Sequence, residues 1–380
     1  MMDRLIIIGE RLKRARESLG LTQEDVATKL EIGRPRYSDI ENGKRDVPLK
    51  DLYRFAEFYG RPIDYFIKET LLTNSGFKVL FRKTEGDEEV ARVVTEFENL
   101  CEKMCELENI SGITVRPPVN QDYQFERNRE WYWGKHYADF ERKQLDLGQA
   151  PLRNLSQLLE EKRGLKIFYL PIPPERGVYG MFTYDQKMGG CVLINSNPNF
   201  GNQLFSLAHE YAHFVFHKDK SGIISTEQDQ NSTDEKVANS FASNFLIPED
   251  TLRDLFNMRI TDVSDIKAED VIYLADYFGV SFTAMAYRLN NLKLITDKIK
   301  DELINYTWVT SVRESMGISE PERSRSKFPT LYLHLAIKAF QQGKLTTAKL
   351  ADFLEIPLYQ AMDLGRKLRG SIQDEPGNSV

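Results

Sequence analysis

The segment LAHEYAHFVFH constrains the local fold more than any other part of the chain. It places His209 and His213 four residues apart, with Glu210 directly after the first histidine. On an α-helix, residues four apart lie one above the other on the same face. Apolar neighbours such as Leu204 and Phe214 are typical of a helix that packs in a core. The segment therefore predicts a buried helix that presents two imidazoles on one face.

Two imidazoles in this arrangement can bind one zinc ion. Glu210 lies one position further round the helix, where it can take a proton from a metal-bound water whose pKa zinc lowers to about 7. The same group can then protonate the leaving amine of a cleaved peptide. A tyrosine or histidine from the C-terminal half could stabilise the oxyanion of this reaction, with Tyr273 and Tyr287 as unranked candidates. The competing interpretation is a pair of core histidines with an exposed glutamate. We predict a hydrolytic zinc site, with manganese as an alternative, since imidazole and carboxylate ligands accept several divalent ions.

A catalytic zinc site needs a third protein ligand that leaves one position for water. His217 continues the row of histidines, but along a straight helix it rises about 12 Å from His209. We therefore predict a supporting or packing role for His217. Glu235, at the start of the helix-forming segment EKVANSFASNFLIP, is the strongest candidate for the third ligand. Asp234 is the second candidate and Glu227 the third.

A second motif lies near the start of the chain, in LTQEDVATKLEIGRPRYSDIENGKRDVP. Thr22 is expected to cap a short helix, and a three-residue turn follows at 31–33. A second helix is expected to open at Arg34 and Pro35, with proline in the favoured first turn, and to stop before Gly43. Two short helices joined by such a turn match a helix-turn-helix, whose second helix enters the major groove of DNA.

Composition places both motifs in an ordinary globular chain. With 380 residues, 41% hydrophobic and 28% charged, it suits two or three domains. The initial run LIIIG is shorter than the roughly 7–15 residues of a signal-peptide core, and no run of about 18 apolar residues predicts a membrane span. We expect a cytoplasmic protein, nucleoid-associated when bound to DNA. The net charge of −6 argues against nonspecific coating of nucleic acid by the whole molecule.

Three cysteines fit that compartment, and none has the CxxC spacing of a disulfide or zinc framework. We predict that all three are buried structural thiols. They are Cys101, Cys105 and Cys191.

The overall pattern predicts an α+β, mainly helical fold. Three strand-like runs, at 166–170, 178–184 and 191–196, predict a small antiparallel sheet before the metal helix. The run at 191–196 is either an edge strand that accepts an extended substrate or a fully paired strand. Residues 218–234 are expected to form a polar loop. The aromatic-rich stretch 123–140 predicts a docking core between domains rather than a platform for single-stranded nucleic acid.

The order of segments in this region resembles the ImmA/IrrE family of bacterial metallopeptidases. The resemblance is carried by the strand ending in Asn195, LAHEYAH, ExxANxFAxxxLIP and FGVSFTAMAYRLNNL, and it covers residues 145–295 and, more loosely, 330–365. It implies a zincin-like domain with three metal ligands and one catalytic base; the ligands are His209, His213 and Glu235, and the base is Glu210. Several members cleave a helix-turn-helix repressor, so the resemblance implies a protein substrate of the repressor or antitoxin type.

The helix-turn-helix motif near the N-terminus resembles the Xre (Cro/C1-type) family over residues 9–66. The resemblance implies a double-stranded DNA operator. The residues it places on DNA are Gln23 at the backbone, Arg34, Arg36 and Ser38 near base edges or phosphates, and Lys44 and Arg45 on the flanking backbone. Residues 34–45 contain four basic and two acidic side chains, a local net charge of +2 that suits phosphate contact. Two departures, Glu31 in the turn and Pro35 in the reading helix, leave a protein-binding role open.

These features predict five segments along the chain. They are a helix-turn-helix DNA-binding domain at 1–70, a helical linker with the aromatic docking segment at 71–144, the metallopeptidase domain at 145–295, a C-terminal helical region at 296–370, and a disordered tail at 371–380. The C-terminal region includes LTTAKLADFLEI, which is similar to another helix-turn-helix core. We expect it to bind the protein partner or to shape the mouth of the active-site cleft.

Three functions remain open at this level. The first is a regulator, expected to be a homodimer, that binds DNA and cleaves a repressor or antitoxin. The second is a transcription factor whose metal site senses a ligand or a metal without proteolysis. The third is a site-specific protease whose DNA-binding domain only brings it to its substrate.

Overall fold

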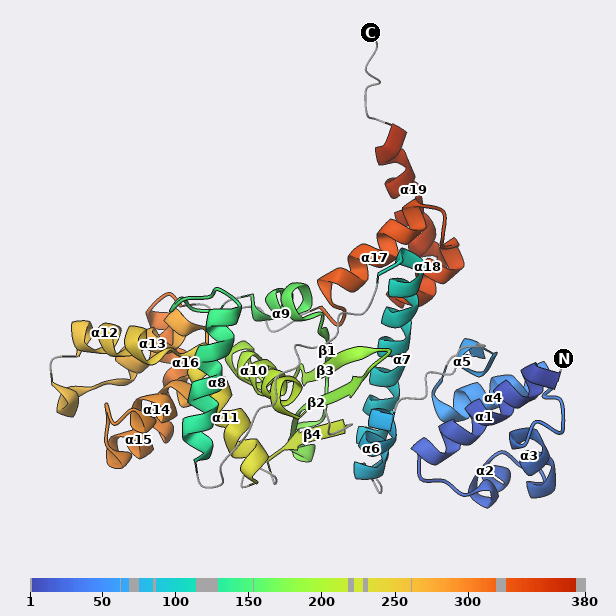
Figure 1. The fold of residues 1–380 in the computed structure, drawn as a ribbon, viewed down its shortest axis with the longest axis horizontal. Helices are drawn as coiled ribbons and strands as arrows, with labels where there is room; N and C mark the ends of the chain where they lie inside the picture. The colour runs from blue at the N-terminus through green and yellow to red at the C-terminus, as the bar shows by residue number, and fades with distance from the viewer. Residues whose placement is uncertain are drawn as a thin grey trace, which may run out of the picture. The chain divides into compact units, whose positions relative to one another are not determined.

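The computed structural model describes residues 2–61, 63–67, 75–84, 87–113, 129–152, 154–217, 222–227, 232–260, 262–318 and 326–373. They belong to two compact units. The first is drawn from Met1–Glu102, Thr183–Asp185 and Asp219–Ile224, and the second from Lys103–Phe182, Gln186–Lys218 and Ser225–Val380 (Figure 1). Within these described stretches, no helix combines the length and apolar character that crossing a membrane requires.

The first unit is helical. Its helices are α1 (Met2–Ser18), α2 (Gln23–Lys29), α3 (Arg34–Glu41), α4 (Leu49–Tyr59), α5 (Ile63–Ile67), α6 (Ser75–Lys83) and the first part of α7 (Glu88–Ser111). Helix α2 begins as predicted, because the Thr22 side chain accepts a hydrogen bond from the backbone of Asp25 and the Asp25 carboxylate accepts one in return. Glu31 occupies the turn in a left-handed conformation, at φ 50°. Apolar faces of α1 to α5 pack into one core.

Buried ion pairs join α1 and the end of α4 to helix α7. Glu98, on α7, accepts hydrogen bonds from Arg14 and from Arg61, the latter at 2.8 Å. Glu102, one turn further along α7, lies 3.4 Å from Arg11. Charges taken out of water stabilise a contact only when they are paired with good geometry. This cluster therefore makes the docking of α7 on the helix-turn-helix bundle specific.

The second unit contains the remaining helices and most of the sheet. Its helices are the rest of α7, α8 (Glu130–Gln144), α9 (Leu155–Arg163), α10 (Phe200–Phe216), α11 (Thr233–Leu246), α12 (Glu249–Arg259), α13 (Ala268–Phe278), α14 (Phe282–Asn291), α15 (Asp297–Ile304), α16 (Val309–Ser315), α17 (Thr330–Gln341), α18 (Thr347–Leu354) and α19 (Leu358–Gln373). Short 3₁₀ turns lie at Pro174–Arg176 and Val263–Asp265. The mainly helical α+β fold is confirmed.

Four strands form one sheet in the order β1-β3-β2-β4. They are β1 (Lys166–Leu170), β2 (Val178–Asp185), β3 (Gly189–Asn195) and β4 (Gly222–Thr226). Strands β1 and β3 run parallel, so the prediction of a wholly antiparallel sheet is wrong and the sheet is mixed. Strands β1 and β2 are consecutive in the sequence but are not neighbours in the sheet, because β3 lies between them.

This strand order decides between the two alternatives for β3 and corrects one expectation about another strand. Strand β3 is the fully paired strand rather than a substrate edge, because it lies inside the sheet between β1 and β2, and all of its residues are buried. The edge on the other side is β4, which forms inside the stretch 218–234 that was predicted to be a loop. Its five residues, GIIST, were too short a run to stand out among polar neighbours.

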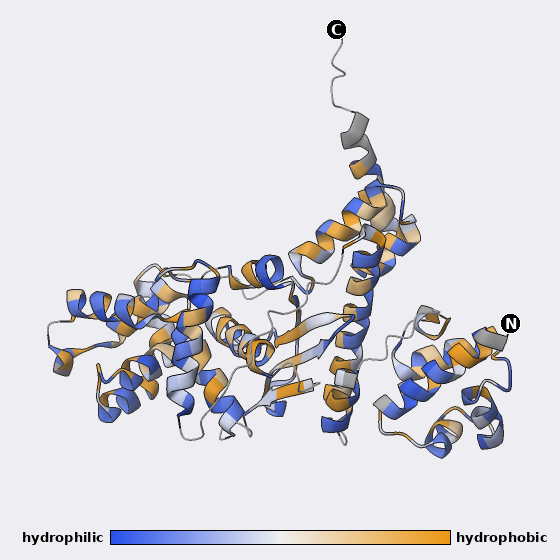
Figure 2. Ribbon diagram, viewed as in Figure 1, coloured by the Kyte–Doolittle hydropathy of each residue, from blue (hydrophilic) through white to orange (hydrophobic). Residues whose placement is uncertain are grey.

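Helix α10 is the centre of the second unit. The Asn199 side chain caps it by accepting a hydrogen bond from the backbone of Asn202. Figure 2 shows that α10 and the strands beside it are largely hydrophobic, and α10 packs against both β3 and α11. Helix α8 packs closely along α11, where a Cβ at Gly134 would lie 2.4 Å from Ser240. Helix α11 therefore packs against α8 as well as against α10.

The predicted aromatic docking segment forms helix α8, while its part at 123–128 lies outside the described residues. Trp133 stacks on Tyr137, whose ring lies 5.3 Å from that of Phe216 at the end of α10. Within the described part, these rings therefore pack on the α10–α11 pair. Trp131 and Tyr132 are partly exposed on the same helix.

The C-terminal helices repeat the pattern of the N-terminal motif. Thr346 caps α18 as Thr22 caps α2, and Glu355 ends α18 with φ 52°, close to the value at Glu31. Helix α18 contacts both α17 and α19. The similarity of LTTAKLADFLEI to a helix-turn-helix core thus extends to its backbone. Helix α19 continues to Gln373, and the remainder of the predicted tail, 374–380, lies outside the described residues.

Candidate metal centre and DNA-reading face

The candidate metal centre lies between α10 and α11. The middle of α10 carries His209, Glu210 and His213, and the first turn of α11 carries Glu235. Their exposed fractions are 6%, 0%, 0% and 6% in that order. The prediction of a buried helix with both imidazoles on one face is confirmed at the level of the fold.

The three predicted ligand residues converge on one point. The Nε2 atoms of His209 and His213 are 3.1 Å apart. The carboxylate of Glu235 lies 2.9 Å from the first Nε2 and 3.3 Å from the second. All three ligand atoms lie within 4.8 Å of one another, so together they can hold a metal ion. A pair of unrelated core histidines would not share one carboxylate in this way.

The alternative third ligands lie elsewhere. Asp234 is 3.2 Å from Nε2 of His217 and so belongs to a neighbouring contact. Glu227 follows β4, is exposed, and its backbone N–H donates to the carbonyl of Gly177 at 3.0 Å. Of the three carboxylates considered from the sequence, Glu235 is the one that faces both histidines.

The charge states of these residues suit a divalent ion. Burial lowers the pKa of His213 to about 4, which leaves this imidazole neutral and able to ligate at neutral pH. Burial alone would raise the pKa of Glu235, but hydrogen bonds from both histidines outweigh it and hold that pKa well below its usual range. Burial opposes protonation of His209, but its hydrogen bond to Glu235 and the nearby carboxylates raise the pKa of this imidazole, so a bound metal ion would take the place of its proton. Two imidazoles and one carboxylate are a donor set that zinc accepts and that manganese also tolerates.

Each imidazole is also held from its outer side. The Nδ1 atom of His209 is 3.0 Å from the side-chain oxygen of Asn239, one turn after Glu235 on α11. The Nδ1 atom of His213 is 2.9 Å from Nδ1 of His217. The spacing in EKVAN could have indicated Asn239 as a partner of the site, since residues four apart on α11 share a face.

Strand β2 passes directly beside Glu210. A Cβ at Gly180 would lie 2.6 Å from Oε1 of Glu210 and 2.8 Å from its Cγ. Only glycine therefore leaves room for this side chain beside the strand. Sequence reasoning missed this residue, although a glycine inside a strand often marks the close approach of another group.

The far end of α11 is anchored by two buried arginines. Arg142 donates to the carbonyl of Phe245, and Arg288 donates to that of Ile247 at 2.8 Å. Cations at a helix C-terminus interact favourably with its exposed carbonyls. Burial lowers the pKa of each guanidinium to about 10, so both remain charged at neutral pH. These contacts hold α11 in the position that brings Glu235 to the histidines.

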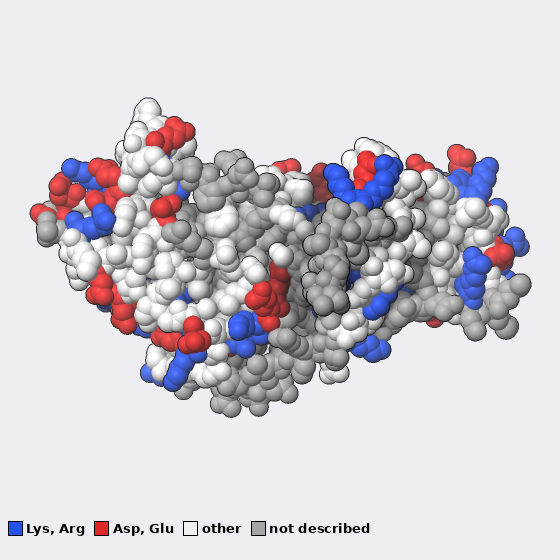
Figure 3. All heavy atoms as spheres, turned by 90° about the horizontal axis from the view of Figure 1, so that it is seen from above, with Lys and Arg blue, Asp and Glu red and all other residues white. Residues whose placement is uncertain are grey.

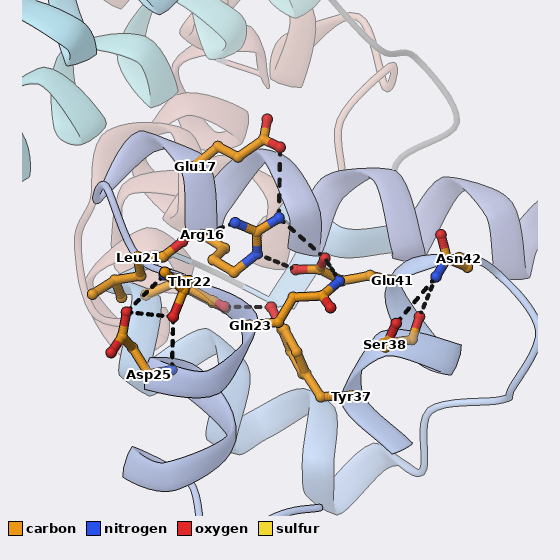
Figure 4. Close-up of polar contacts among 11 residues, drawn as sticks. Arg16, Glu17, Leu21, Thr22, Gln23, Asp25, Tyr37, Ser38, Glu41 and Asn42 are labelled. Atoms are coloured by element: carbon orange, nitrogen blue, oxygen red, sulfur yellow. Dashed lines mark hydrogen bonds and ion pairs between the residues drawn. The ribbon is translucent and has the colours of Figure 1, made fainter. Parts of the chain in front are cut away.

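The predicted DNA-reading residues lie on α2, α3 and the turn that follows. Figure 4 shows Gln23 and Ser38 among them. Gln23 points toward α3, where its amide donates to Glu41 at 2.7 Å. Glu41 also accepts from Arg16 of α1 at 2.7 Å. The three helices of the motif are thus tied together by one buried carboxylate.

The remaining predicted contacts lie on the outer side of the motif. Arg34 is 63% exposed and lies 3.6 Å from Glu24, while Arg36 pairs with Asp51. The carbonyl of Ser38 accepts from Asn42 at 2.7 Å. Lys44 and Arg45 are exposed in the turn after α3. Figure 3 shows basic and acidic side chains interspersed over one face of the molecule. Contact of these residues with DNA stays a prediction.

Family comparisons match the two regions of the chain that carry these residues. A helix-turn-helix family matches residues 12–66, and the IrrE N-terminal-like domain family matches residues 160–290. The uncharacterised HTH-type transcriptional regulator MJ0272 of Methanocaldococcus jannaschii is 45% identical over 60 residues, which cover 91% of it and 16% of this chain. The chain belongs to the helix-turn-helix transcriptional regulators. Behind that module it carries an IrrE-like, metallopeptidase-type domain.

Other regulators match the same module. Control protein C.MunI of Mycoplasma sp is 41% identical over 61 residues, covering 82% of that protein and 16% of this chain. The regulator ImmR of Bacillus subtilis is 32% identical over 77 residues, and the match spans 61% of its length and 20% of this chain. Among solved structures, the match to ComR from Streptococcus suis covers 97% of this chain and 93% of the ComR chain. The sequence identity is 13% and the TM-score is 0.15. The sequence matches to regulators thus concern the helix-turn-helix module.

Two tyrosines outside the candidate metal centre pack against basic side chains. The guanidinium of Arg259 lies 3.5 Å from the ring centre of Tyr273, and Lys300 lies over the ring of Tyr287. Both tyrosines are candidates from the sequence for stabilising the oxyanion of a hydrolysis reaction, and that role stays a prediction. The three cysteines are buried thiols, as predicted.

Proposed function

We propose that this chain is a DNA-binding transcription regulator whose IrrE-like domain is a zinc-dependent endopeptidase. The observation that carries the proposal is the convergence of His209, His213 and Glu235, with Glu210 on the same helix. Manganese is the alternative ion. The proposal assigns the three converging residues as metal ligands and Glu210 as the general base.

The chain's own residues then divide the chemistry between them. Zinc bound by the three ligands would polarise the scissile carbonyl and the attacking water. Glu210 takes one proton from that water as its oxygen attacks the carbonyl carbon. The same group returns the proton to the amide nitrogen as the carbon–nitrogen bond breaks, which releases a carboxylic acid and an amine. The backbone of β2 at Gly180 holds Glu210 against the metal helix.

The proposed substrate is a helix-turn-helix repressor or an antitoxin-type protein, with a double-stranded DNA operator as the second partner. The substrate class is supported by the resemblance to ImmA/IrrE peptidases, and the operator by the Xre-type module. We further propose that the chain acts in the cytoplasm as a homodimer, because operators for such modules are read by paired helices. The predicted operator contacts are Gln23, Arg34, Arg36, Ser38, Lys44 and Arg45.

A second function is favoured by one observation. The side chain of Glu210 is 0% exposed, whereas a protein substrate has to reach the group that activates water. A regulator that senses a metal or a small ligand through the same residues needs no such access. In this case the metal controls transcription without cleavage.

Two variants separate the functions. Glu210→Gln preserves size and should retain zinc and DNA binding, while cleavage falls by about 10²–10⁴-fold. His213→Ala should lose zinc. If proteolysis drives the response, both variants abolish the transcriptional output, and Glu210→Gln captures its intact protein substrate in a pulldown. If the site only senses, Glu210→Gln keeps a full output and His213→Ala alone abolishes it. A His213→Ala protein with wild-type zinc content in an elemental assay would contradict both functions.

A further inference from the structure

A chain of hydrogen-bonding groups extends outward from the candidate metal centre. His217 ends helix α10 and is 4% exposed. Its Nδ1 lies 2.9 Å from Nδ1 of His213, and its Nε2 lies 3.2 Å from the carboxylate of Asp234. Asp234 and Glu235 are neighbours in the first turn of α11. One turn of α11 therefore contacts the histidines of α10 at two places.

The end of this chain determines where its protons lie. An ionised carboxylate only accepts hydrogen bonds, so Asp234 requires a proton on Nε2 of His217. A neutral imidazole with its proton on Nε2 offers Nδ1 as an acceptor. Nδ1 of His213 must then be the donor across the 2.9 Å contact. Consequently Nε2 of His213, which faces His209 and Glu235, presents a lone pair instead of a proton.

The other ligand histidine reaches the same state by a shorter route. Its Nδ1 contacts the side-chain oxygen of Asn239, which is also an acceptor. His209 thus needs one partner, an amide, whereas His213 needs two, an imidazole and a carboxylate. Both arrangements place the imidazole proton on the outer nitrogen, as a metal ligand requires.

We propose that His217 and Asp234 are positioning residues that fix the tautomer and orientation of His213 for metal binding. The inference rests on the proposed metal site and adds to it a role for two residues that do not touch the ion. It also explains why a third histidine follows the motif at a distance from which it cannot join the other two on one ion. Asp234, considered above as a ligand, acts through His217.

The test compares side chains that keep or remove the acceptor. His217→Phe retains a flat ring without an acceptor, and His217→Asn places an oxygen near the former Nδ1. Zn²⁺ affinity is measured on the metal-stripped full-length chain by competition with a chromophoric chelator. We expect His217→Phe to weaken Zn²⁺ binding by about 10–100-fold and His217→Asn to bind nearly as well as the wild type. This rescue would not occur if His217 only filled space.

Asp234→Ala provides an independent measurement on a side chain that is 41% exposed, so the fold should tolerate it. It should weaken Zn²⁺ binding by about 10-fold. The matched control is Asp250→Ala, which removes an exposed acid from the first turn of α12 and should leave Zn²⁺ affinity unchanged. Equal melting temperatures of the metal-free Asp234→Ala and Asp250→Ala proteins would separate positioning from stability.

The tautomers of the histidines can be measured directly by ¹⁵N NMR spectra of the zinc-loaded chain with labelled histidine. The chain has only five histidines, so the spectrum is simple to assign. We expect Nδ1–H on His213 and Nε2–H on His217. A proton on Nδ1 of His217, or equal Zn²⁺ affinity in His217→Phe, Asp234→Ala and wild type, overturns the inference and leaves the metal site standing. Failure of the wild-type chain to bind Zn²⁺ at all would instead remove the proposed function.

Discussion

The metal centre and the DNA-reading face are each built on a pair of helices, but they use the pair in opposite ways. In α10 and α11 the key side chains point inward, are almost fully buried and meet within 4.8 Å of one another. In α3 the key basic side chains point outward, and Arg34 and Arg36 are 63% and 41% exposed. The buried residues contact one another, while the exposed ones pair with single carboxylates beside them.

This difference shows that packing can fix the geometry of a buried site, whereas it does not fix the partners of exposed side chains. Burial removes competing water and leaves each polar group at the metal centre only a few partners, so its geometry is already formed in the protein. An exposed arginine exchanges a surface carboxylate for a phosphate at little cost, because surface ion pairs contribute only about 0–1 kcal/mol. The metal centre should therefore be sensitive to small steric changes, and the reading face to charge.

The largest effect is expected from one added methyl group at the buried site. Gly180→Ala would place Cβ 2.6 Å from Oε1 of Glu210, and displacement of this base should reduce substrate cleavage by about 10²-fold. Zinc content should stay at the wild-type level, because the ligands lie on α10 and α11. The measurement is cleavage of the captured substrate beside an elemental assay.

Gly33→Ala is the matched control for that variant. Its nearest neighbour would lie 3.9 Å away and its φ of −64° suits any residue, so cleavage should be unaffected. Wild-type cleavage by Gly180→Ala would show that the buried site tolerates displacement of Glu210 and would break the comparison.

A second prediction concerns a buried carboxylate outside both motifs. Burial raises the pKa of Glu160 to about 7, although the backbone of Leu331 donates to it. In the unfolded chain this carboxyl has its ordinary pKa of 4.5. Between these two values the folded state binds more protons, so stability falls as pH rises, by up to about 2 kcal/mol. Glu160→Gln should remove this fall.

Urea unfolding of wild type and variant across that pH window measures the effect. Glu269→Gln, at an exposed position in the first turn of α13, should leave the pH dependence of stability unchanged. A wild-type chain whose stability relative to Glu160→Gln does not change between pH 4.5 and 7 would show that burial does not control this group.

The smallest effect is expected at the exposed face. Arg36→Ala removes one charge from α3 and should weaken operator binding by about tenfold and reduce the salt dependence of binding by about one phosphate contact. Lys298→Ala, which removes an exposed charge from α15, should leave both unchanged. The measurement is a DNA titration at several salt concentrations. Sequence-independent loss of affinity would assign Arg36 to the DNA backbone, and no loss would contradict its predicted contact.

Local rules predicted the parts that depend on neighbours in the chain. The Thr22 cap, the two short helices of the N-terminal motif and the metal helix followed from spacing, capping and apolar periodicity. The three strands at 166–196 were also recognisable from their apolar content. Strand β4 was missed, because a run of five residues between polar segments carries too little periodicity to identify it.

The sequence by itself determined that His209 and His213 share a helical face and that an acidic residue had to join them from elsewhere. Only the tertiary structure decided which one, by packing α11 against α10 so that Glu235 faces the pair and Asp234 faces His217. The same packing brought Gly180 to Glu210 and placed β3 inside the sheet rather than at its edge. Spacing defines a helix face because one turn repeats locally, whereas contacts between distant segments depend on how whole faces exclude water together.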